Sequence, residues 1–192
     1  GAQRASVARD QAKAELTASY LDHVDLLQEI WTALPDATLV GDSTQLVYAG
    51  NMYVEAPRET AWFNSATGFG TLGYAAPAAI GAALGHPERP VVALLGDGGF
   101  QFTLAELGSA RDCNADVAFL VWNNSGYMEI ETSMTAASIT PMGVTPSAPD
   151  FSAVAAAYGL PSRRVQNRED LISALKDLPR PCLIEYLDSV TA

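Results

Sequence analysis

Two apolar runs without polar alternation constrain this chain more than any other feature of its sequence. Residues 90–95 read Pro-Val-Val-Ala-Leu-Leu, and residues 116–122 read Asp-Val-Ala-Phe-Leu-Val-Trp. A strand that is apolar on both faces must be covered on both faces, which is typical of a parallel sheet between two layers of helices. The sequence therefore predicts a three-layer α/β/α fold with a mainly parallel sheet.

Shorter strands and helices alternate along the rest of the chain. Further strands are predicted at 37–42, 60–65 and 181–187. Helices are predicted at 21–34, 75–84, 103–110, 150–158 and 167–178. We expect Thr103 and Glu106 to form a capping box, and residues 135–149 to form a long loop. We expect residues 1–19 to be a linker or an added start, and residues 20–192 to form one domain.

Composition narrows the partners that this chain can have. Its 22 acidic and 11 basic side chains give a formal net charge of −11, which argues against nucleic-acid binding because a phosphate backbone requires a basic surface. No apolar run reaches the length of about 18 residues that spans a bilayer, so we expect no membrane partner. Cys113 and Cys182 form no disulfide framework and favour free thiols in a cytoplasmic protein.

Small polar residues follow both apolar runs, as Gly96-Asp97-Gly98-Gly99 and as Asn123-Asn124-Ser125-Gly126. The carboxyl ends of parallel strands meet at one edge of the sheet, where ligands bind. Oxygen ligands from Asp97 and Asn124 suit Mg²⁺, and glycine N–H groups suit an anion. Either motif alone is more typical of a turn. Together they predict a magnesium ion held against a diphosphate.

The spacing of these motifs resembles a known signature. Gly96-Asp97-Gly98, 24 intervening residues and Asn123-Asn124 resemble the C-terminal cofactor-binding domain of the thiamine diphosphate-dependent 2-oxo acid decarboxylase and acetolactate synthase family. Residues 70–83 look like the glycine-rich segment of the same family. The resemblance covers most of residues 20–188 and implies that the chain binds thiamine diphosphate and Mg²⁺.

The resemblance also implies a role for each matching residue. The metal would be ligated by Asp97, Asn124 and the carbonyl of Gly126. The cofactor would be bound by Ser43, Thr44, Gln45, Gly70, Leu72, Gly96, Asp97, Gly98, Gly99, Asn124, Gly126, Tyr127 and Met128. Gly70 and Leu72 would act in catalysis. The Gly70 carbonyl would contact the aminopyrimidine of the cofactor, and Leu72 would hold thiamine in the bent form that serves as an electron sink.

Three of these assignments have simpler interpretations, and one further residue is a candidate. Ser43 and Thr44 are also typical helix caps, and Leu72 could be an ordinary core leucine. Glu129 follows the second polar turn and is a candidate for contact with the substrate.

The resemblance implies that one part of the active site comes from elsewhere. In this family a glutamate from a separate pyrimidine-binding domain activates the cofactor, and a neighbouring subunit usually supplies that domain. The 36 residues before the first predicted strand are too few to hold it. We therefore expect a homo-oligomer, and a chain that is inactive alone because it is a fragment or one subunit of a split enzyme.

Several functions remain open at this stage. The turn ending at Tyr127 resembles simple decarboxylases, whereas Pro77–Ala83 and the following Gly85-His86-Pro87 resemble acetolactate synthase. We favour decarboxylation of a 2-oxo acid over carboligation. A non-catalytic domain that retains the fold is a further alternative. A nicotinamide-binding domain is disfavoured, because Gly41-Asp42-Ser43-Thr44 lacks the required glycine pattern.

Overall fold

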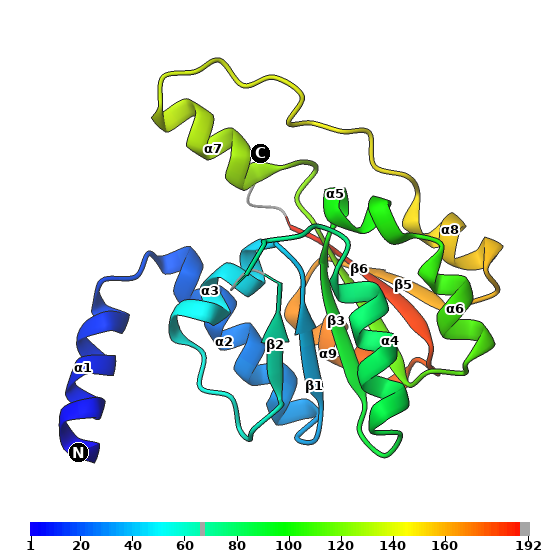
Figure 1. Cartoon of the computed structure of the whole chain (residues 1–192), viewed down its shortest axis with the longest axis horizontal. Helices are drawn as coiled ribbons and strands as arrows, with labels where there is room; N and C mark the ends of the chain where they lie inside the picture. The colour runs from blue at the N-terminus through cyan, green and yellow to red at the C-terminus, as the bar shows by residue number, and fades with distance from the viewer. Residues whose placement is uncertain (66–67, 189–192) are drawn as a thin grey trace.

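The computed structural model describes residues 1–65 and 68–188, and a parallel sheet lies at its centre (Figure 1). Six strands pair in the order β2-β1-β3-β4-β6-β5. The strands are β1 (Thr38–Gly41), β2 (Trp62–Asn64), β3 (Val91–Gly96), β4 (Val117–Asn123), β5 (Ser162–Val165) and β6 (Cys182–Leu187). Each neighbouring pair is parallel, so the predicted sheet is confirmed.

Helices cover the two faces of this sheet. The α-helices of the described residues, whether or not they cover the sheet, are α1 (Ala2–Ala14), α2 (Ala18–Ala33), α3 (Gln45–Tyr53), α4 (Ala75–Gly85), α5 (Asp97–Phe100), α6 (Glu106–Asp112), α7 (Met128–Ala136), α8 (Phe151–Ala157) and α9 (Arg168–Asp177). One core cluster packs α2, α3 and α9 against the sheet, and the other packs α4, α6 and α8 against its opposite face. The three-layer α/β/α architecture is therefore confirmed.

The two apolar runs are buried on both faces, as predicted. Along β3, Val92 and Leu94 belong to the first core cluster, whereas Ala93 and Leu95 belong to the second. Successive side chains of a strand point to opposite faces, so one continuous apolar run supplies both cores.

Among the elements that escaped the sequence analysis, β5, α3 and α7 have a polar or mixed composition. The short strand β5 reads Ser-Arg-Arg-Val, which carries no apolar alternation. Helix α3 follows β1 directly, and helix α7 occupies residues 128–136 and overlaps the start of the predicted loop at 135–149. Strand β5 pairs with β6 and α3 has four buried residues, so tertiary contacts stabilise these two elements, whereas α7 has no buried residue.

The predicted helix start at Thr103 is wrong. A helical turn, α5, begins at Asp97 directly after β3, and a 3₁₀ turn at Gln101–Thr103 leads into α6. The buried Thr103 hydroxyl has no hydrogen-bond partner among the described residues, so no capping box forms. The glycines after Asp97 let the chain turn into a helix without an intervening loop.

The N-terminal helix stands apart from the layers. None of the residues of α1 is buried, and the helix projects away from the sheet in Figure 1. The packed core begins with α2, whose N-terminus is capped by the Thr17 side chain. A domain from 20 to 192 stays a prediction, and its last four residues lie outside the described ones. No helix in the described ranges is long and apolar enough to cross a membrane.

Candidate functional site

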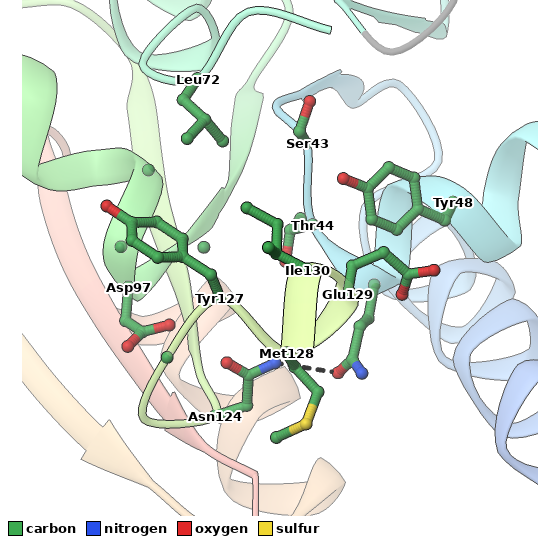
Figure 2. Close-up of a pocket in the computed structure, with 15 residues that line it drawn as sticks. Ser43, Thr44, Tyr48, Leu72, Asp97, Asn124, Tyr127, Met128, Glu129 and Ile130 are labelled. Carbon is green, nitrogen blue, oxygen red and sulfur yellow. Dashed lines mark hydrogen bonds between the residues drawn. The ribbon is translucent and has the colours of Figure 1, made fainter. Parts of the chain in front are cut away.

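A pocket lies at the carboxyl ends of β1, β3 and β4, where helices α3, α5 and α7 begin (Figure 2). Its lining comprises Ser43, Thr44, Gln45, Tyr48, Leu72, Gly96, Asp97, Gly98, Gly99, Asn124, Gly126, Tyr127, Met128, Glu129 and Ile130. All the residues that the sequence assigned to the cofactor line this pocket, except Gly70. Four strand-to-helix and loop segments that are distant in the sequence thus meet at one edge of the sheet.

Oxygen atoms from two of these segments face one another. The Asn124 amide donates from Nδ2 to Gln45 Oε1 at 3.1 Å, which directs its oxygen toward Asp97 and Gly126. The Asn124 atom on that side lies 2.9 Å from the Gly126 carbonyl and 3.2 Å from Asp97 Oδ1. If the amide were turned over, Nδ2 would donate to both oxygens instead.

These separations suit a bound cation. Ligands about 2.1 Å from Mg²⁺ in octahedral geometry lie about 3 Å from one another. With the amide oxygen of Asn124 directed inward, it lies at about this separation from both the Asp97 carboxylate and the Gly126 carbonyl, and all three are hard oxygen ligands. Asp97 and Asn124 therefore converge, and Mg²⁺ fits the chemistry of the three groups.

The carboxylate of Asp97 is buried and incompletely satisfied. Asp97 is 1% exposed, and its Oδ2 has no hydrogen-bond partner in the described part of the chain. Burial raises the pKa of this carboxyl to about 6, although hydrogen bonds from nearby backbone N–H groups oppose the rise. An unpaired buried acceptor is costly unless a ligand satisfies it.

The two glycines after Asp97 occupy the first turn of α5 and leave the backbone open to the pocket. A Cβ atom on Gly98 would lie 2.4 Å from Cε1 of Tyr127, and one on Gly99 would lie 3.3 Å from Cδ2 of Leu72. N–H groups in a first helical turn have no partner within the helix, so they can bind an anion. The backbone that could bind phosphate thus begins directly after β3, at Asp97.

The loop after β1 contributes from the opposite side of the pocket. Thr44 is the N-cap residue of α3, but its side chain makes no capping hydrogen bond. Ser43 Oγ donates to the Gly70 carbonyl at 3.0 Å. Neither hydroxyl therefore caps the helix, which leaves Thr44 available to a ligand and joins Ser43 to the glycine-rich segment.

Gly70 and Leu72 lie differently from each other. Gly70 adopts a φ of 65° and lies outside the pocket lining, where its carbonyl accepts from Ser43. Leu72 is half-buried and projects into the pocket (Figure 2), so it is not an ordinary core leucine. The structure therefore brings Leu72, but not Gly70, to the surface that would face a cofactor.

Three residues that the sequence analysis did not single out belong to this region. Tyr48 and Ile130 line the pocket, and both follow site residues on helices that were not predicted. Asp42 is fully buried behind it and accepts from Ser43 N at 2.7 Å and from Ala75 N at 3.5 Å. Its position directly after an apolar strand, like that of Asp97 after β3, was a usable signal.

The pocket lining is acidic. Asp97 and Glu129 are the carboxylates in it, and no Lys, Arg or His is among its described residues. Glu129 is exposed and lies beside Tyr48 (Figure 2). Burial raises the pKa of Tyr48, and the charge of Glu129 adds to the rise. An anionic ligand here would therefore depend on backbone N–H groups and a cation.

Comparisons with known proteins agree with this geometry. The model of the family "Thiamine pyrophosphate enzyme, C-terminal TPP binding domain" matches residues 42–186; pyrophosphate is a synonym of diphosphate. A solved thiamine diphosphate-dependent 4-hydroxybenzoylformate decarboxylase from Rhodococcus jostii RHA1 has 28% identity and a TM-score of 0.76. That similarity covers 86% of this chain and 33% of the other.

Curated relatives have related activities. The probable 2-ketoarginine decarboxylase of Pseudomonas aeruginosa is 40% identical over 83% of this chain and 29% of its own length. Benzoylformate decarboxylase of the same species is 32% identical over 78% of this chain and 29% of its own length. The large subunit of acetolactate synthase isozyme 1 of Escherichia coli is 28% identical over 85% and 30%. This chain belongs to the thiamine pyrophosphate enzyme family and corresponds to its C-terminal cofactor-binding domain.

Proposed function

We propose that this chain holds the diphosphate end of thiamine diphosphate, with Mg²⁺, in an enzyme that decarboxylates a 2-oxo acid. The single observation that supports this most is the convergence of oxygens from Asp97, Asn124 and Gly126, with one Asp97 oxygen left unpaired in the described part of the chain. Asp97, Asn124 and the Gly126 carbonyl would ligate the metal. A local cation also explains how a chain with net charge −11 can hold a diphosphate.

The other pocket residues would bind and orient the cofactor. Backbone N–H groups of Gly98 and Gly99 would bind phosphate oxygens, and the Ser43–Gln45 loop with Gly96 would border them. Leu72, Tyr127 and Met128 would exclude water and fix the position of thiamine. When bound, thiamine diphosphate supplies the electron sink for loss of carbon dioxide. The Gly70 carbonyl, which accepts from Ser43, has a second lone pair that could accept from the aminopyrimidine.

A pyrimidine-binding domain would complete the site. The relatives described above extend well beyond this domain, since the chain covers 29–30% of their lengths. We propose that this domain supplies the activating glutamate from a longer chain or a separate subunit, within a homo-oligomer. We place the enzyme in the cytoplasm, in line with the free thiols Cys113 and Cys182.

Product analysis of the full-length protein separates decarboxylation from the alternative of carboligation. With pyruvate and other 2-oxo acids, release of aldehyde with carbon dioxide supports a decarboxylase. Accumulation of acetolactate from pyruvate would instead support a synthase. The relative with 40% identity and the solved structure described above are both named as decarboxylases, so we favour decarboxylation.

The acidic pocket favours a substrate with a cationic side chain. Glu129 lines the pocket without a basic neighbour in its described lining, and the most identical relative described above is named for 2-ketoarginine. A guanidinium group would pair with a carboxylate here, whereas an acidic side chain would be repelled. We expect kcat/KM to be higher for 2-oxo-5-guanidinopentanoate than for 2-oxoglutarate, and Glu129→Gln to reduce this preference with little effect on pyruvate.

A melting experiment tests the binding function against a domain that keeps the fold without binding the cofactor. Mg²⁺ and thiamine diphosphate are added separately and together to the full-length protein, or to this chain with its pyrimidine-binding subunit. Binding to the native state raises the melting temperature. We expect a rise that requires both components. The absence of any rise would favour a domain that keeps the fold without the chemistry.

A further inference from the structure

A buried carboxylate, Glu185, lies behind the turn formed by residues 123–126 and pairs with the partly exposed Arg164. Glu185 on β6 is 2% exposed and faces Arg164 on β5, whose Nε donates to Glu185 Oε2 at 2.6 Å. Arg164 also pairs with Asp150 at 3.2 Å. None of these three residues lines the pocket, so the cofactor site as described does not use them.

The second oxygen of Glu185 links this pair to the turn. Glu185 Oε1 accepts from Asn123 Nδ2 at 2.7 Å, and Asn123 Oδ1 accepts from the N–H of Ser125 at 3.0 Å. Ser125 has a φ of 64°, a backbone conformation that non-glycine residues seldom adopt. The Asn123 amide thus holds the turn that carries Asn124 and Gly126.

The chemistry of these groups makes the orientation of Asn123 depend on Glu185. An ionised carboxylate only accepts hydrogen bonds, so the Asn123 amide must direct Nδ2 toward Glu185. Its oxygen is then directed to the N–H of Ser125. Arg164 donates to the other oxygen of Glu185 and fixes its position.

We infer that Glu185 is a positioning residue for the metal-binding turn, acting through Asn123 and without touching the metal. This inference rests on the proposed function, because it assigns Glu185 a role only if Asn124 and Gly126 bind Mg²⁺. A chain of hydrogen bonds with fixed polarity places both ligands, as outer groups do for many metal sites.

The variant Glu185→Gln tests the polarity and keeps the shape. The oxygen of the new amide pairs with Arg164, so its nitrogen faces Asn123 and turns that side chain over. The N–H of Ser125 then faces Asn123 Nδ2, which is also a donor, and the hydrogen bond between them is lost. In the double variant Glu185→Gln/Asn123→Asp, the amide nitrogen introduced on β6 donates to one oxygen of the new aspartate, while the other oxygen accepts from Ser125. The polarity is thereby restored at unchanged net charge.

Mn²⁺ serves as the probe, with free Mn²⁺ measured by electron paramagnetic resonance at saturating thiamine diphosphate. The full-length protein is used. We expect the dissociation constant to rise about tenfold or more in Glu185→Gln, and the double variant to return to within about threefold of the wild type. Asp116→Asn is the matched control. It removes a carboxylate that pairs with Arg180 at the amino ends of the strands, away from the pocket, and this variant should bind Mn²⁺ normally.

Each other result counts against the inference. Unchanged Mn²⁺ affinity in Glu185→Gln, or equal weakening in Asp116→Asn, would overturn it while leaving the metal site intact. Tighter binding in the single variant Asn123→Asp would show that charge, and not polarity, restores the double variant. If Glu185→Gln does not fold, the affinity of the double variant decides alone. A wild type that binds no Mn²⁺ removes the proposed function itself.

Discussion

The carboxylate of Asp42, at the end of β1, accepts a hydrogen bond from the N–H of Ala75 at the start of α4, 3.5 Å away. It also accepts from Ser43 N at 2.7 Å. One fully buried side chain therefore joins the loop after β1 to the segment that carries Leu72. Two walls of the pocket are fixed relative to each other by a residue that a ligand would not touch.

Asp42→Asn should change how stability depends on pH. Burial raises the pKa of Asp42 above its ordinary value of 3.8, although four backbone hydrogen bonds oppose the rise. The folded protein therefore holds this proton more tightly than the unfolded chain, and the resulting stability is present below about pH 3.8 and lost as the pH rises through the folded value. An asparagine does not titrate.

Urea unfolding of wild type and Asp42→Asn across pH 4–7 checks this prediction. We expect the unfolding free energy of the variant to increase relative to that of the wild type as the pH rises. Asp97 titrates in both proteins and cancels from the difference. A difference that stays flat over this range would show that the Asp42 pKa is not raised.

Gly98→Ala should strain the contact with Tyr127. The new methyl group would lie 2.4 Å from the tyrosine ring, so the ring or the α5 backbone must move. We expect a loss of about 1–3 kcal/mol in unfolding free energy from overpacking, and weaker binding of thiamine diphosphate. In a Tyr127→Ala background the ring is absent, so Gly98→Ala should reduce the unfolding free energy much less than it does in the wild type. Chemical denaturation of all four proteins gives the coupling energy.

Leu72→Ala separates a cofactor role from a packing role. The side chain is half-buried, so its removal should cost less stability than truncation of Leu94, which is fully buried in the sheet. We expect kcat of the full-length enzyme to fall at least tenfold while the melting temperature of the metal-free protein changes little. Equal losses of stability in Leu72→Ala and Leu94→Ala would show that Leu72 acts as a core packing residue.

The sequence was sufficient to predict the parallel sheet and the approach of the site residues at its carboxyl end. The apolar runs of β3 and β4 predicted a parallel sheet, and parallel pairing brings Asp97 and Asn124 to one edge. It was insufficient for β5, which carries no apolar alternation and pairs with β6, and for α7, which has no clear period and no buried residue. The ion pair between Arg164 and Glu185 is an example, since no spacing in the sequence announces it.

Asp97→Asn should raise the unfolding free energy of the metal-free protein and weaken binding of Mg²⁺ with thiamine diphosphate. In the metal-free protein, burial makes the charged carboxylate unfavourable, as its raised pKa of about 6 indicates. Removing that charge should stabilise the metal-free protein at pH 7.5 by about 1–2 kcal/mol, after allowance for solvent screening. The same change replaces the carboxylate among the proposed metal ligands by a neutral amide, so Mg²⁺ with thiamine diphosphate should raise the melting temperature much less than in the wild type.

Thermal denaturation with and without both ligands checks the two effects together. Asp25→Asn, on an exposed position of α2, is the matched control and should keep the wild-type response to Mg²⁺. A variant that loses stability without metal would show that the Asp97 carboxylate is already satisfied by the backbone. A variant that still responds fully to Mg²⁺ would place the metal elsewhere, because a buried acidic ligand cannot be replaced by a neutral amide without loss of affinity.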